Sequence, residues 1–270
     1  MPPIRFRTIE VSSPRFEANN LRLVTVKSAA LGQRADMTVH IPPAAKTVAN
    51  VPIVILLHGV YGSHWGWTLS GGAHKTSERM IEAGEIPPFV IAMPSDGLWG
   101  DGSAYVPHRI QNFEQWIVSE VPAAVAHAAS NVTPDSPVFI AGLSMGGFGA
   151  LRLAAKYPTR FRAASGLSSI THFEQLKDFV QEPLSAFESN ESDHSIFATM
   201  LRNRAKLPPF RFDCGSEDML INANRELHTK LLAAEIPHHY EEFPGSHEWP
   251  YWESHLADTL RFFASHVPSS

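Results

Sequence analysis

Residues 137–158 read PVFIAGLSMGGFGALRLAAKYP and place Ser144 between Gly142 and Gly146. The apolar run before the serine has the length of a buried strand, and the residues after it have helical spacing. In a strand-to-helix turn this sharp, a side chain two places before or after the central residue would collide with the neighbouring strand or helix. The stretch therefore predicts either a tight structural turn or a serine nucleophile that stands clear of the backbone.

Short β-rich runs alternate with helical segments on both sides of this turn. The runs are 53–59 (IVILLHG), 89–94 (FVIAMP), 138–144 (VFIAGLS), 162–168 (RAASGLS), 209–215 (PFRFDCG) and 239–245 (HYEEFPG). Continuous apolar strands are typical of parallel sheets that are buried on both faces. Helical spacing groups Phe113, Trp116, Ile117, Val121 and Val125, then Leu151, Leu153 and Ala154, and finally Trp252, Leu256, Leu260 and Phe263. The order predicts an α/β fold with a doubly wound, mostly parallel sheet and helices on both faces.

Two further segments complete the expected organisation. Residues 21–27 (LRLVTVK) and 36–42 (DMTVHIP) indicate two antiparallel strands, joined by a turn with Gly32, that form one edge of the sheet. Residues 171–206 have mixed charge and weak strand character. We expect them to form a cap-like insertion of short helices over the carboxyl ends of the strands. No Pro- or Ser-rich linker divides the chain, so residues 1–270 are predicted to be a single α/β domain.

Composition narrows the classes of partner. The chain has 270 residues, is 44% hydrophobic and carries a net charge of −5, with no basic face suited to nucleic acid. Its one cysteine, Cys214, excludes an internal disulfide, and MPPIRFRTIEV has no apolar segment of signal-peptide length. The longest apolar run, VPIVILL, is far shorter than the roughly 20 residues that span a bilayer. We expect a cytoplasmic protein that acts without a membrane or nucleic-acid partner. The composition is compatible with both a monomer and a homo-oligomer.

A serine needs a base and a carboxylate to become a nucleophile, and in a fold of this order the acid and then the histidine follow it along the chain. The segment FDCGSEDML offers Asp213, Glu217 and Asp218. Asp218 is the predicted acid because it lies in the loop beyond a strand, whereas Asp213 lies within the strand. The alternative is an exposed loop carboxylate or a cap for the following helix.

His247 is the predicted base. It lies in FPGSHEWPYW, just beyond the last predicted strand, where a loop can present it to Ser144. The other histidines after Asp218 fall in helices or at the start of a strand, which is the wrong end of the sheet. They are His228, His238, His239, His255 and His266. A structural role for His247 is the alternative reading.

Acyl transfer also requires donors for the oxyanion. On this kind of fold one donor is the N–H of the residue after the nucleophile, here Met145, and the other comes from the loop after an earlier strand. The loop HGVYG at 58–62 offers Val60. An ordinary glycine turn is the alternative.

Three tryptophans follow predicted strands at the same end of the sheet. Trp65, Trp67 and Trp99 either line an acyl or aromatic-alcohol pocket or pack in the core. The histidines show no HExxH-like pattern, so we expect neither a metal nor an organic cofactor.

With these residues placed, the chain resembles the α/β-hydrolase esterases of the esterase D and antigen 85-like group, which includes tributyrin-type and feruloyl esterases. The resemblance rests on LLHGVYG, MPSDG, AGLSMGGFGAL, CGSEDML and PGSHEWPYW in that order, from about residue 20 to the C-terminus. It implies Ser144, Asp218 and His247 as nucleophile, acid and base, and Val60 and Met145 as oxyanion donors.

The predicted function is therefore hydrolysis of a small-molecule carboxylic ester through an acyl-serine. An S-formylglutathione hydrolase-like thioesterase or an acyltransferase is the alternative enzyme. Those hydrolases usually carry His in place of Leu143 and a cysteine in the oxyanion loop, and both are missing here. A non-catalytic binding protein on a hydrolase scaffold is the alternative of another class.

Overall fold

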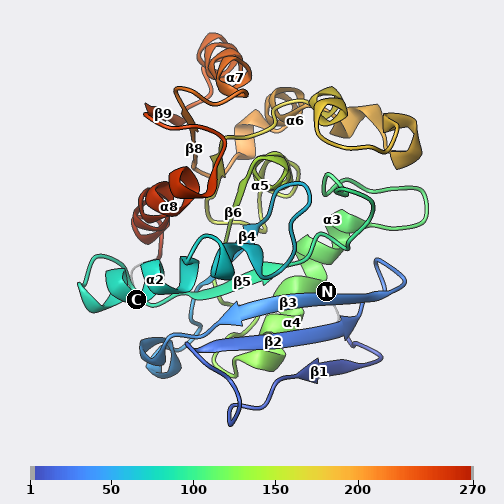
Figure 1. The fold of residues 1–270 in the computed structure, drawn as a ribbon. Helices are drawn as coiled ribbons and strands as arrows, with labels where there is room; N and C mark the ends of the chain where they lie inside the picture. The colour runs from blue at the N-terminus through green and yellow to red at the C-terminus, as the bar shows by residue number, and fades with distance from the viewer. Residues whose placement is uncertain (1–3, 269–270) are drawn as a thin grey trace.

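The computed structural model describes residues 4–268, whose centre is a nine-stranded sheet (Figure 1). The strands, in sheet order, are β1 (Ile9–Val11), β2 (Leu21–Lys27), β3 (Arg34–His40), β5 (Val90–Pro94), β4 (Ile53–Leu57), β6 (Val138–Leu143), β7 (Ala164–Leu167), β8 (Phe210–Gly215) and β9 (His239–Phe243). Strands β1 to β3 are antiparallel, and β3 pairs antiparallel with β5. From β5 to β9 every pairing is parallel.

Helices cover both faces of this sheet. The core on one face includes residues of α1 (Gly66–Leu69), α2 (Ala73–Glu82) and α8 (Trp249–Ala264). The core on the other face includes residues of α3 (Phe113–Gln115), the π-helical turn η2 (Trp116–Glu120), α4 (Val121–Ala128), α5 (Met145–Lys156) and α7 (Ile221–Ala233). A 3₁₀ turn, η1 (Pro43–Thr47), follows β3. The doubly wound arrangement predicted from the sequence is confirmed.

The central strands follow from their side chains. All five residues of β4 and all five of β5 are buried, as expected for strands covered by helices on both faces. The two predicted antiparallel strands are present as β2 and β3. They are not outermost, however, because the short strand β1 pairs with β2 and takes the edge. Its three residues, IEV, are too few to show a period in the sequence.

The predicted insertion consists of short helices. They are η3 (Phe173–Asp178), η4 (Leu184–Phe187), η5 (Glu191–Asp193), α6 (Ile196–Arg202) and η6 (Arg204–Lys206). Figure 1 shows this gold segment beside the green loop that precedes α3, and the ion pair between Arg109 and Glu188 joins the two. Phe173, Leu176 and Phe187 are buried in the same core as α5. The insertion is therefore packed onto the main body of the protein.

The parallel register brings several loops to one edge of the sheet. Leu57 pairs with Gly142, and Leu143 pairs with Leu167, so β4, β6 and β7 end side by side. Strands β8 and β9 end together as well, with Gly215 opposite Phe243. Ligands of open α/β sheets bind beyond the carboxyl ends of the strands. Within residues 4–268, no helix has the length and apolar composition required to cross a membrane.

Candidate active site

Ser144 lies at the turn between β6 and α5 in a strained backbone conformation, with φ 55° and ψ −119°. The glycines on either side allow this. A Cβ on Gly142 would lie 2.3 Å from the carbonyl oxygen of Gly146, and a Cβ on Gly146 would lie 2.4 Å from that of Leu57. The steric reason for the two glycines that the sequence suggested is confirmed.

A continuous chain of hydrogen bonds joins Ser144 to His247 and Asp218. The serine Oγ lies 3.0 Å from Nε2 of His247, and Nδ1 of His247 lies 2.9 and 3.1 Å from the two carboxylate oxygens of Asp218. Because a carboxylate only accepts, Nδ1 carries the proton, and Nε2 is then free to accept from the serine hydroxyl. A hydroxyl in this position can pass its proton to the imidazole.

Burial and charge separate the three carboxylates considered for this position. Asp218 is buried, and Glu217 is exposed. Burial opposes ionisation of Asp218, but the hydrogen bond and charge of His247 outweigh it and lower the pKa of the carboxyl. Asp213 instead accepts from Tyr251, 2.8 Å away, and burial raises its pKa to about 6. Of the three, only Asp218 faces His247.

The other five histidines that follow Asp218 in the sequence have partners other than Ser144 or lie at the surface. His228 and His238 contact one another at 2.8 Å, and His255 contacts Asp258 at 3.1 Å. His266 lies against the carbonyl oxygen of Phe262, and His239 is an exposed residue of β9. The structure brings only His247 of this group to Ser144.

The backbone N–H groups of Met145 and Val60 have no hydrogen-bond acceptor among residues 4–268. Met145 is the first residue of α5, where a helix favours negative charge. Val60 lies in the loop after β4, and a Cβ on the neighbouring Gly59 would lie 3.3 Å from Cβ of Ser144. Both groups are therefore free to donate beside the serine.

His58 orients the peptide that carries the Val60 N–H. Its Nε2 accepts from the N–H of Asp96 at 3.0 Å, so Nδ1 is protonated and donates to the carbonyl oxygen of Gly59 at 2.7 Å. The C=O and N–H of a planar trans peptide point in opposite directions. The Val60 N–H consequently points away from His58. Sequence reasoning did not assign His58 a role, although it begins the HGVYG loop.

The three tryptophans have different surroundings. Trp67 is 1% exposed, belongs to the core and donates from its indole N–H to the carbonyl oxygen of Leu57. It therefore packs in the core, where the β4 carbonyl oxygen satisfies its only polar group. Trp99 is half-buried, with its ring 4.5 Å from that of His108 and 4.6 Å from that of Phe187. Trp65 is 46% exposed.

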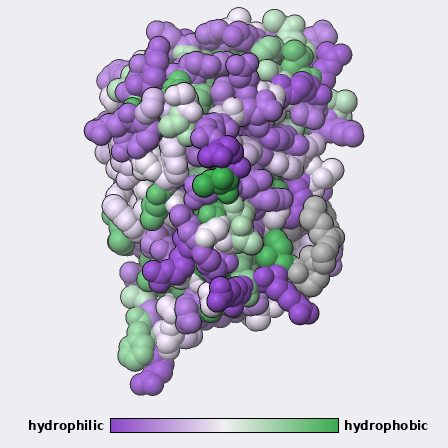
Figure 2. Space-filling model, turned by 90° about the vertical axis from the view of Figure 1, so that its right-hand side faces the viewer, coloured by the Kyte–Doolittle hydropathy of each residue, from purple (hydrophilic) through white to green (hydrophobic). Residues whose placement is uncertain are grey.

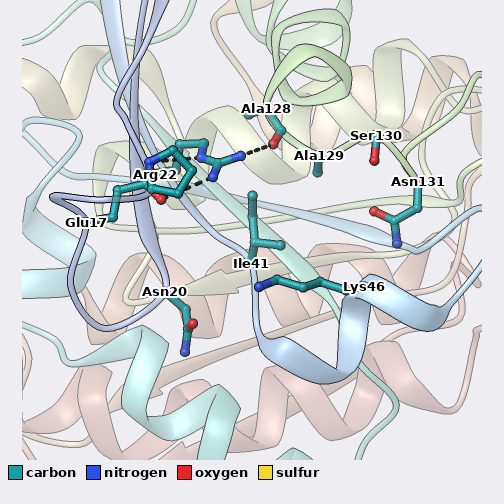
Figure 3. A pocket seen from close by; sticks show the side chains of 10 residues that line it. Glu17, Asn20, Arg22, Ile41, Lys46, Ala128, Ala129, Ser130 and Asn131 are labelled. Carbon is teal, nitrogen blue, oxygen red and sulfur yellow. Dashed lines mark hydrogen bonds and ion pairs between the residues drawn. The ribbon is translucent and has the colours of Figure 1, made fainter.

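A cavity of about 400 Å³ opens at the opposite edge of the sheet (Figure 3). It lies beyond the end of β3, which pairs with the start of β5. In it, the guanidinium of Arg22 is held by Glu17 and by the carbonyl oxygen of Ala128 (Figure 3). None of the candidate catalytic or oxyanion residues, which are Val60, Ser144, Met145, Asp218 and His247, lines this cavity. Within residues 4–268 there is no cluster of three or more His, Cys, Asp or Glu side chains placed to hold a metal ion.

The sequence of this chain is similar to those of known esterases. The family model described as "Putative esterase" matches residues 28–263. An acetyl esterase from Caldicellulosiruptor saccharolyticus is 25% identical over 234 residues, which cover 80% of this chain and 84% of that protein. An esterase of Mycobacterium tuberculosis is 26% identical over 260 residues, which cover 82% of this chain and 54% of that protein. The chain thus spans about half the length of the second relative.

A solved ferulic acid esterase has the same fold. It superposes with a TM-score of 0.78 at 22% identity, over 96% of this chain and 99% of that one. An S-formylglutathione hydrolase from Staphylococcus aureus superposes with a TM-score of 0.73 at 19% identity, over 95% of this chain and 99% of that one. At these identities the solved structures show the α/β-hydrolase fold alone. The family match over residues 28–263 carries the assignment further: the chain belongs to the esterase family and is an enzyme that acts on ester bonds.

Proposed function

We propose that this esterase hydrolyses small-molecule carboxylic esters through an acyl-serine, with Ser144 as nucleophile. The observation that carries the proposal is the unbroken hydrogen-bond chain from Ser144 through His247 to Asp218. These three residues come from three separate loops at one edge of the sheet. A serine, an imidazole and a carboxylate in this order are the groups that nucleophilic acyl transfer requires.

In the first step the Oγ of Ser144 attacks the ester carbonyl while Nε2 of His247 takes its proton. Asp218 holds the imidazole by Nδ1 and stabilises its cationic form. The N–H groups of Val60 and Met145 donate to the oxyanion of the tetrahedral intermediate. Collapse breaks the bond to the alcohol, which leaves with the proton from His247.

In the second step water attacks the acyl-serine. His247 takes a proton from the water and returns it to Ser144, so that the acid is released and the enzyme is restored. Thioester hydrolysis and transfer of the acyl group to another alcohol use the same acyl-serine. A panel of matched esters and thioesters, with and without added alcohol, distinguishes these reactions.

Trp65 is the tryptophan that we retain as a pocket residue, because its side chain is accessible.

The proposal is tested by Ser144→Ala. Loss of the nucleophile is expected to lower kcat on p-nitrophenyl acetate by about 10⁴-fold or more, while the folded state is preserved. Mass spectrometry after fluorophosphonate treatment is expected to place one adduct on Ser144, and to find none in His247→Ala.

The matched control is Ser254→Ala, which removes an exposed serine hydroxyl of α8. It is expected to keep both turnover and the adduct. Normal turnover of a folded, pure Ser144→Ala enzyme would exclude Ser144 as the nucleophile.

A further inference from the structure

A turn of the insertion, residues 179–182, is attached to the loop that carries Val60. The phenol of Tyr61, the residue after Val60, donates to the carbonyl oxygen of Phe179. These two residues are 118 positions apart in the chain. Contact between them therefore exists only because the insertion folds back over the loop after β4.

Asp101 fastens the same two segments together. Its carbonyl oxygen accepts from the N–H of Tyr61 at 2.8 Å, and its carboxylate accepts from the N–H of Gln181 at 2.8 Å. Its own N–H donates to the carboxylate of Glu182 at 3.1 Å. Three backbone N–H groups thus hold the turn in one position relative to Val60.

This arrangement places the ring of Phe179 beside the candidate triad and holds Tyr61 against the same turn. The ring centroid of Phe179 lies 6.1 Å from that of His247, with 32° between the planes. Phe179 is only half-buried, and Tyr61 is 67% exposed. Tyr61 also has a positive φ of 60°, which is uncommon for a residue with a large side chain. Aromatic faces that the protein itself leaves uncovered, next to a reacting group, are available to a ligand.

The chemistry indicates which part of an ester would meet these rings. His247 gives its proton to the leaving oxygen, so the alcohol part lies on the His247 side of the reacting carbon. Phe179 flanks that same imidazole. Resting on the function proposed above, we propose that Tyr61 and Phe179 bind the alcohol part of the ester and favour aryl alcohols over small alkyl ones.

The test varies the two halves of the substrate separately. One series keeps the acetyl group and changes the alcohol from methyl to phenyl to 1-naphthyl. The other keeps p-nitrophenol and changes the acyl group from acetyl to butyryl. For each variant the ratio of kcat/KM within a series is compared with the same ratio in the wild type, so that intrinsic differences in leaving-group reactivity cancel.

Phe179→Ala is expected to lower the naphthyl-to-methyl ratio by about 3- to 10-fold, the effect of losing one aromatic contact. The butyryl-to-acetyl ratio is expected to stay within about twofold. Tyr61→Ala should act in the same direction. Tyr61→Phe loses the hydrogen bond of the phenol but keeps the ring and the Asp101 hydrogen bonds that hold the turn, so it should leave the alcohol ratio nearly unchanged. Ile110→Ala, which removes a side chain of a residue that is 79% exposed, serves as the control and should alter neither ratio.

Other outcomes overturn the inference. A changed acyl ratio with an unchanged alcohol ratio would place the rings on the acyl side, and unchanged ratios in both series would reduce them to packing residues. If Phe179→Ala does not fold, Phe179→Leu provides the same comparison, because it keeps apolar volume without an aromatic face. Failure of the proposed function is distinguishable, since it would appear as activity in Ser144→Ala.

Discussion

The positive φ of Ser144 is maintained by hydrogen bonds on both sides of the residue. Its N–H donates to the carbonyl oxygen of Leu167 at 2.9 Å, and its carbonyl oxygen accepts from the N–H of Ile170 at 3.2 Å. Both partners belong to the end of β7 or the loop after it. Strain of this kind persists only where neighbouring structure over-determines the conformation. The side chain is thereby directed toward His247.

His58 offers a prediction at this scale. His58→Ala removes the donor that orients the Gly59–Val60 peptide and is expected to lower kcat by about 10- to 100-fold with little change in KM, because an oxyanion donor acts mainly in the transition state. His58→Asn is expected to recover much of the loss, since its amide nitrogen can replace Nδ1. Steady-state kinetics on a p-nitrophenyl ester measure both.

Thermal unfolding of the two His58 variants supplies the control. A purely structural role would lower stability and the fraction of active enzyme in both variants, and kcat per active site, titrated with a fluorophosphonate, would then equal that of the wild type. Equal kcat in wild type and His58→Ala would contradict the proposal that His58 orients the Val60 N–H through its hydrogen bond to the Gly59 carbonyl oxygen.

Among the elements, the helical segment between β5 and β6 has a feature that the sequence did not predict. The N–H of Val121 donates to the carbonyl oxygen of Trp116, five residues back, in a π turn. Pro122 follows and has no N–H to donate to an α-helical ladder. Residues spaced four apart move gradually round an α-helix, because each α turn holds about 3.6 residues. A π turn holds more residues and so keeps such residues on one face. Phe113, Ile117 and Val121 all stay buried.

The insertion is fastened to α5 by a buried cluster of charges. Arg152 of α5 is 0% exposed, and its guanidinium contacts Glu114, the carbonyl oxygen of Tyr105 and, at 3.5 Å, Asp193 of the insertion. Lys156 lies 2.7 Å from Asp193 and 3.0 Å from Glu114. Burial opposes ionisation of Glu114, but these cations outweigh it and lower its pKa.

Glu114→Gln is expected to lower the free energy of unfolding by about 3–5 kcal/mol, because Arg152 is left buried without its closest counter-charge. Urea denaturation measures the change. Glu226→Gln removes a carboxylate from an exposed i,i+4 pair with Lys230 and is the matched control, with no resolvable change expected. Equal changes in the free energy of unfolding for the two substitutions would show that the buried cluster stabilises the protein no more than an exposed ion pair does.

Across the whole molecule, two hydrophobic cores lie on the two faces of one sheet, and charge is left mainly to the outside. On the face shown in Figure 2, hydrophobic residues occur in small groups between hydrophilic ones. Burial lowers the pKa values of several histidines and so favours their uncharged form. They are His40, His64, His74, His194, His238 and His108, the last to about 4.

These histidines predict that the protein loses stability in mild acid. Their pKa in the unfolded chain is about 6.5, so as the pH falls from 6.5 toward 4 the unfolded chain binds protons that the folded protein does not. The free energy of unfolding should therefore decrease over this range. Asp213, with a pKa raised to about 6, acts in the opposite direction but is a single group. Urea denaturation at several pH values measures the sum.

His108→Phe supplies the specific test. It preserves an aromatic ring among Trp99, Phe113 and Phe187 and removes the titrating group. The free energy of unfolding should then change less steeply with pH between pH 6.5 and 4. The difference in slope should correspond to the uptake of up to about one proton fewer on unfolding. A slope identical to that of the wild type would show that His108 does not contribute.

The sequence alone was sufficient for the features that depend on neighbouring residues. Apolar runs identified the buried strands, and the steric demands of a sharp turn identified the Ser144 elbow, because strand period and turn geometry are local properties of a chain. Asp218 and His247 were selected by their position after strands, since parallel strands must end at one edge. The structure brings those two residues to Ser144.

Only the tertiary structure decided what depends on contacts between distant segments. Edge strand β1 needed β2 as its partner, Trp67 was placed in the core by the packing of α1, and His58 was oriented by a backbone N–H of the loop after β5. The contact between Tyr61 and Phe179 likewise required the insertion to fold over the loop after β4. Such contacts have no period or spacing in the sequence, because each is set by the packing of whole elements rather than by neighbouring residues.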